Sequence, residues 1–89
     1  MRIAVTRVAG DGSVSRAMVD TASRDDAERW EQLVDGAGLD LPPPYQPEPG
    51  ETVYEIRVDE RVVQVAESGL VGPLEELAEA VLEQGADAA

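Results

Sequence analysis

The chain has 89 residues and a formal net charge of −12, with 19 Asp and Glu against seven Arg, so it has room for one domain only. It contains no Cys, His or Lys, which removes thiolate and imidazole catalysis, Schiff-base chemistry and the side chains that dominate zinc sites. We therefore expect a protein that is not an enzyme and needs no cofactor or metal. The excess of carboxylates disfavours nucleic acid and anionic membranes as partners.

A β-hairpin is the first predicted element. β-Branched and apolar side chains dominate residues 2–8 and 14–19, and the intervening segment 9–13 has the glycine, aspartate and serine content of a turn. The N-terminal segment lacks the apolar core of a signal peptide, and no apolar run approaches ~18 residues. We therefore expect a cytoplasmic chain without a membrane span.

A helix is predicted after the hairpin. Ser23 is followed three positions later by Asp26, a pattern typical of a helix N-cap. The apolar residues that follow share one helical face: Ala27, Trp30, Leu33 and Val34. Trp30 is assigned to the core, and either Gly36 or Gly38 is expected to end the helix in a left-handed conformation.

A proline-rich loop comes next. Residues 39–50 hold five of the six prolines, and the three consecutive ones favour extended polyproline II backbone. A long loop in a small domain carries function more often than not. The apolar residues Leu39, Leu41 and Tyr45, together with Leu70 in the loop before the last helix, have two interpretations: they contact a partner, or they pin their loops to the core. The sequence leaves both open.

The C-terminal half repeats the hairpin-then-helix pattern. Residues 52–58 and 61–66 alternate as the strands of a second hairpin. Pro73 suits the first position of a final helix, and Gly85 is expected to end it. The apolar face of this helix consists of Leu74, Leu77, Ala78, Val81 and Leu82. The tail, residues 86–89, carries nothing to anchor it, and we expect it to fray.

The predicted order is ββαββα within one domain, residues 1–89. Because each element has one apolar side, we expect an α+β fold with a four-stranded antiparallel sheet and two helices packed on one face. Short connections place the turn 9–13, the proline-rich loop and residues 67–72 at one end of the sheet. Residues 21–24 and 59–60 lie at the other end. The strand order is left open.

No motif in the chain indicates catalysis. The adjacent pairs Asp25-Asp26 and Glu75-Glu76 point about 100° apart on a helix, so we expect them to be solvated. The glycines form no phosphate-binding pattern, and the serines have no histidine partner. An enzyme that uses carboxylates alone is therefore the least favoured interpretation.

Four short segments are distributed over most of the chain: MRIAV at 1–5, VDT at 19–21, TVYEIRV at 52–58 and LVGPLEEL at 70–77. Together they resemble the emfourin family, small protein inhibitors of protealysin-type, thermolysin-like metalloproteases. The resemblance implies competitive occlusion of the active-site cleft of a zinc metalloprotease by an inhibitor that adds no metal of its own. Relatives tend to have a Gly-Gly-Phe-like turn where this chain has residues 9–12, and a leucine near the start of the first helix.

The partner implied by the resemblance is a thermolysin-like metalloprotease. The candidate protease-binding residues are Leu39, Leu41, Tyr45, Ala22, Ser23 and Arg24. The first three lie in the proline-rich loop and the last three at the family position, and the loop is favoured because such clefts accept a large apolar side chain. The alternative is an acidic protein–protein interaction module that binds a basic partner. A monomer is favoured over an oligomer, although an uncovered edge strand of the second hairpin can pair with a second copy.

Overall fold

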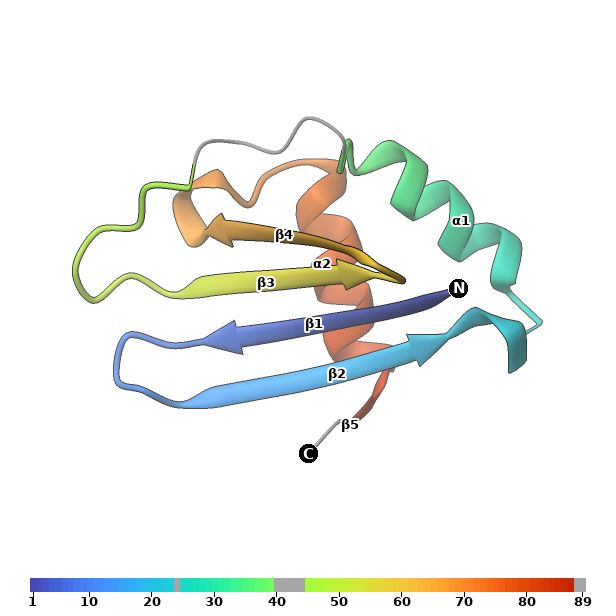
Figure 1. Ribbon diagram of the computed structural model, residues 1–89, viewed down its shortest axis with the longest axis horizontal. Coiled ribbons are helices and arrows are strands. Elements are labelled where there is room, and N and C mark those ends of the chain that lie inside the picture. The colour runs from blue at the N-terminus through green and yellow to red at the C-terminus, as the bar shows by residue number, and fades with distance from the viewer. Residues whose placement is uncertain (24, 40–44, 88–89) are drawn as a thin grey trace.

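The computed structural model, which describes residues 1–23, 25–39 and 45–87, contains a four-stranded antiparallel sheet and two helices in the order ββαββα (Figure 1). The long strands are β1 (Arg2–Val8), β2 (Val14–Asp20), β3 (Val53–Val58) and β4 (Arg61–Ala66). The helices are α1 (Ala27–Gly36) and α2 (Pro73–Gln84), and the 3-10 turns are η1 (Thr21–Ser23) and η2 (Glu67–Gly69). The α+β prediction is confirmed.

The order of the four long strands, which the sequence left open, is β4-β3-β1-β2, and a short fifth strand, β5 (Ala86–Asp87), extends the sheet beside β2. The central strand β1 pairs with β2 on one side and with β3 on the other, so that Val5 lies opposite both Ala17 and Ile56. All three side chains are buried. Because successive side chains of a strand point to opposite faces, this register puts one apolar face of the whole sheet toward the helices.

Helix α2 covers that apolar face and packs mainly against β2 and β1 (Figure 1). Pro73 stands in its first turn, where a missing N–H leaves no hydrogen bond unmade, and Gly72 before it has a φ of 65°, a conformation that favours glycine. Of the five residues predicted for the apolar face, the buried ones are Leu74, Leu77, Ala78 and Val81, and Leu82 is partly buried against the core. The sequence pattern therefore identified both the extent and the core side of this helix.

Helix α1 packs chiefly on α2, and Trp30 is 1% exposed, which confirms its assignment to the core. The predicted N-cap at Ser23 is wrong, because Ser23 ends the 3-10 turn η1 and the cap of α1 is Asp26. The Asp20 carboxylate accepts the Ala22 N–H at 3.1 Å, and this hydrogen bond favours a turn directly after β2. The turn η1 therefore separates β2 from the start of α1. At the other end of α1, Gly38 has the left-handed φ of 66°.

The C-terminal tail departs from expectation. The predicted fraying is wrong for Ala86 and Asp87, which form a two-residue strand, β5 (Ala86–Asp87), paired with Met18 and Ala17 of β2. Gly85 brings the chain there, because a Cβ at Gly85 would lie 2.9 Å from the Met18 carbonyl oxygen. Residues 88–89 lie outside the described part of the chain. Within that part, no helix has the length and apolar character needed to cross a membrane.

Candidate functional site

Three segments meet at one end of the sheet, as their connection lengths predicted. Gly10, in the turn between β1 and β2, lies against Gly50 so closely that a Cβ at Gly10 would collide with the Gly50 carbonyl oxygen. The Glu67 N–H donates to the Thr52 carbonyl oxygen at 2.9 Å and joins η2 to the start of β3. The turn, the end of the proline-rich loop and η2 therefore form one continuous surface.

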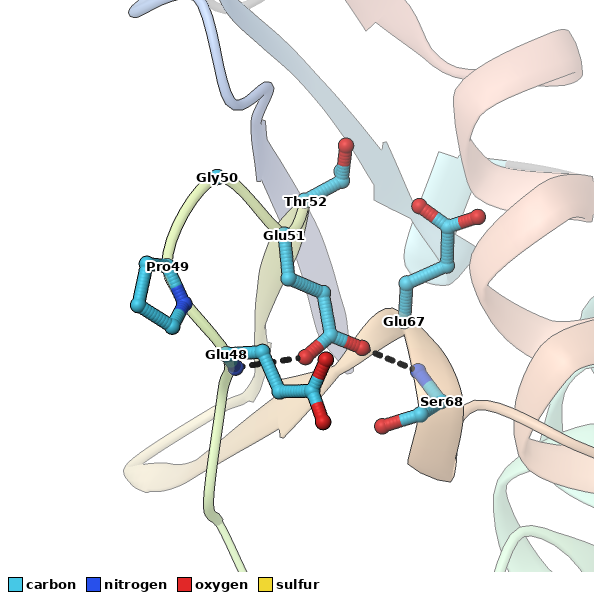
Figure 2. Close-up of a pocket in the computed structure, with 7 residues that line it drawn as sticks. All are labelled: Glu48, Pro49, Gly50, Glu51, Thr52, Glu67 and Ser68. Carbon is cyan, nitrogen blue, oxygen red and sulfur yellow. Dashed lines mark hydrogen bonds between the residues drawn. The ribbon is translucent and has the colours of Figure 1, made fainter.

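Glu51 holds this surface together (Figure 2). One carboxylate oxygen, Oε1, accepts the Glu48 N–H at 2.8 Å, and the other, Oε2, accepts the Ser68 N–H at 2.8 Å. We call this arrangement the Glu51 clasp. The hydrogen bond from the Glu48 N–H, followed by that from Ser68, lowers the pKa of the Glu51 carboxyl below its ordinary value. The clasp links the loop to η2 across a sequence separation of 17 residues.

The segment 45–50 that precedes the clasp is exposed along its whole length. Its first residue, Tyr45, presents 42% of its surface to solvent, and Pro47 and Pro49 restrict its backbone. Gly50 has a φ of 82°, which lets the chain turn back toward β3, and the Glu51 N–H donates to the Glu48 carbonyl oxygen at 3.0 Å. The result is a protruding segment with a fixed return to the sheet.

This surface presents carboxylates, backbone groups and a proline in a shallow depression. A shallow open depression is lined by Glu48, Pro49, Gly50, Glu51, Thr52, Glu67 and Ser68. Backbone N–H groups engage both carboxylate oxygens of Glu51, which makes that carboxylate a poor proton acceptor. No group of three ligating side chains in the described parts of the chain is placed to hold a metal ion.

The predicted loop residues have different environments. Leu39 is only 7% exposed and belongs to the hydrophobic core, so the interpretation that it pins the loop holds for Leu39, and it cannot serve as an exposed anchor. Gly38 explains this placement, because its left-handed conformation redirects the chain as α1 ends. Tyr45 is exposed, and Leu41 lies outside the described residues.

Two of the other three candidate residues, Ala22 and Ser23, lie at the opposite end of the sheet. Thr21, which begins η1, donates its N–H to the Met1 carbonyl oxygen. Asp59, in the turn between β3 and β4, donates its N–H to the Arg2 carbonyl oxygen. Ala22 is exposed, Ser23 ends η1, and Arg24 lies outside the described residues. The structure therefore does not bring the two candidate sets together.

The sequence reasoning missed two features of the loop end. It did not single out Glu51, whose role depends on a partner far along the chain. It also considered Leu70, which is 5% exposed and belongs to the core, but not its neighbour Val71, which is 67% exposed and is the most exposed large apolar residue among those described. Comparison with protein-family models, curated proteins and solved structures gave no match.

Proposed function

We propose that this protein inhibits a thermolysin-like, protealysin-type zinc metalloprotease by occupying its active-site cleft in competition with substrate. The observation that carries the proposal is the exposed, proline-bearing segment 45–50, which the Glu51 clasp fixes to η2. The resemblance to emfourin proteins supports the same function. The proposal places the encounter with the protease in the cytoplasm, and it assigns no catalytic step to the inhibitor.

The clasped segment has the properties that a protein inhibitor needs. An inhibitor binds tightly when the segment that enters the cleft is already ordered, because less conformational entropy is lost on binding. Pro47 and Pro49 restrict the backbone and lack the N–H that an extended substrate offers to a protease. Tyr45 supplies a large side chain that is polar only at its tip, a type enriched among the residues that dominate binding energy.

Titration of a thermolysin-like protease with this protein tests the proposal. Hydrolysis of a small peptide substrate is expected to fall in a saturable manner, with KM raised and kcat unchanged. Tyr45→Ala is expected to weaken inhibition roughly ten- to a hundredfold, equivalent to about 1 to 3 kcal/mol. Ala22→Glu is the matched control at the far end of the sheet, and it should leave inhibition intact. If Ala22→Glu lost inhibition and Tyr45→Ala kept it, the contact with the protease would lie at Ala22 and its neighbours, the position that the family resemblance implies.

The second candidate function is an acidic module that binds a basic partner. It is supported by the negative charge of the helix layer, which consists of α1 and α2. The exposed carboxylates of α1 and α2 are Glu28, Glu31, Asp35, Glu75, Glu76, Glu79 and Glu83. Arg29 is the only basic residue in these two helices. Such a surface attracts cationic proteins in a salt-dependent manner. Undiminished hydrolysis at high inhibitor concentration, together with salt-sensitive capture of a basic protein, would favour this function.

A further inference from the structure

The face of the sheet opposite α2, which we call the open face, has no element packed on it among the described residues (Figure 1). The strand register arranges its side chains in rows. One row consists of Met18, Ala4, Arg57 and Val62, and the next contains Arg16, Thr6, Glu55 and Gln64. The small side chains of the central strand leave a shallow depression of about 250 Å³ between the longer ones.

Apolar surface gathers on the open face. Five large hydrophobic residues are exposed in the described part of the chain, and three of them, Val14, Met18 and Val62, belong to this face. Their exposed fractions are 57%, 38% and 43%. Apolar side chains grouped on one face of a small domain indicate an interaction surface more often than scattered ones do.

The charges of the open face differ from those of the helix layer. Arg16 and Arg57 lie beside Glu55, whereas α1 and α2 carry an excess of carboxylates. Within residues 1–23, 25–39 and 45–87, Arg16, Glu55 and Arg57 form no ion pair. The open face therefore combines apolar groups with charges of both signs that are not paired with one another or with the rest of the described chain, in a protein with a net charge of −12.

We propose that the open face pairs with the open face of a second copy of this chain, forming a face-to-face homodimer. Glu55 and Arg57 are two positions apart on β3, so they point to the same side with opposite charge. A twofold axis that crosses the strand between them sets each arginine against the partner's glutamate. Met18 and Val62 flank this charged centre and lose their exposure to water in the dimer.

Charge distribution favours a second copy over other occupants. A basic protein is drawn to the acidic helix layer, and nucleic acid is repelled by the overall charge. Edge-to-edge pairing through β4 would set the acidic helices of two copies on the same side of one sheet, whereas face-to-face pairing keeps them on opposite outer sides. The proposed dimer differs from the monomer that the sequence favoured, because the proposal uses the position of the charges as well as their number.

The size of the face sets the expected affinity. Four strands of six or seven residues cover roughly 20 Å by 20 Å, an area below that of standard stable interfaces and in the range of weak, transient ones. We therefore expect reversible dimerisation with a dissociation constant in the micromolar range, measured by sedimentation equilibrium over a series of protein concentrations.

A charge-exchange experiment identifies the interface. Glu55→Arg leaves two arginines on β3, and Arg57→Glu leaves two glutamates, so each variant alone should dimerise about tenfold more weakly or worse. An equimolar mixture of the two should recover dimers, because the positive strand of one copy meets the negative strand of the other. Both substituted positions are exposed, so each variant is expected to fold, and thermal unfolding measures this.

Matched apolar substitutions complete the test. Met18→Lys should abolish dimerisation, whereas Val71→Lys, at the most exposed apolar position away from the sheet, should leave it unchanged. Protease inhibition should be the same in all of these variants, so failure of the dimer is distinguishable from failure of the proposed function. Sedimentation as a monomer at every concentration would overturn the proposal. A dimer that persists in Met18→Lys, or that the mixture fails to recover, would do so as well.

Discussion

The two faces of the sheet follow the same alternation of side chains, but they differ in the residue types that they tolerate. On the face toward α2, Ile3, Val5 and Ile56 are each 0% exposed, and a polar group there would be buried without a partner. On the open face, Glu55 and Arg57 occupy neighbouring positions of the same strand and remain in contact with water. The first face is constrained by folding, and the second is available for association.

The largest expected effect separates these faces on a single strand. Ile56→Ala should lower the free energy of unfolding by about 2 to 5 kcal/mol, because it leaves a cavity among side chains that are fully buried. Arg57→Ala, one residue away, should change it by about 0.5 kcal/mol or less, because its side chain is exposed. Urea denaturation of both variants at low protein concentration measures the two values. Losses of similar size would contradict the assignment of the faces.

Local sequence patterns predicted most of the fold. The period-2 and helical repeats identified the four long strands and both helices, since these depend only on which side of each element is apolar. The strand order, the pairing of Ala86 with Met18 and the failed cap at Ser23 depend on contacts between distant segments. The Glu51 clasp belongs to the same class, because its partner Ser68 lies beyond a whole hairpin.

The proline-rich loop offers the same comparison of buried and exposed residues on a smaller scale. Leu39→Ala should lower the free energy of unfolding by about 2 kcal/mol or more, because Leu39 is part of the core. It should leave inhibition of the protease unchanged once the protein is folded. Tyr45→Ala should show the reverse, with little loss of stability and weaker inhibition. If Leu39→Ala weakened inhibition without any loss of stability, Leu39 would have to be exposed when the protein binds the protease, in contradiction to its place in the core.

The smallest expected effect concerns the Glu51 clasp and acid. The pKa of Glu51 is lowered in the folded protein, so the charged clasp stabilises the fold above the ordinary carboxyl value of 4.5. This stability is lost as the pH falls from that value through the lowered pKa, because the protonated carboxyl no longer accepts both N–H groups. Glu51→Gln should remove the part of the pH dependence that Glu51 contributes, because an amide does not titrate in this range. It should also weaken the clasp, because an amide offers one acceptor oxygen instead of two.

Amide hydrogen exchange gives the clasp its own measurement. The pKa of Asp11 is lowered as well, because its carboxylate accepts the Ser13 N–H, so a global unfolding curve would mix the two titrations. The Ser68 amide reports on Glu51 alone, and the Ser13 amide serves as the matched control. Relative to its intrinsic exchange rate at each pH, the Ser68 amide should lose protection in acid, and Glu51→Gln should remove this pH dependence without affecting the protection of Ser13. If the Ser68 amide stayed protected below the lowered pKa of Glu51, the hydrogen bond to Glu51 would not be what protects η2. The prolines and the packing of Gly10 against Gly50 would then have to fix the conformation of the segment 45–50.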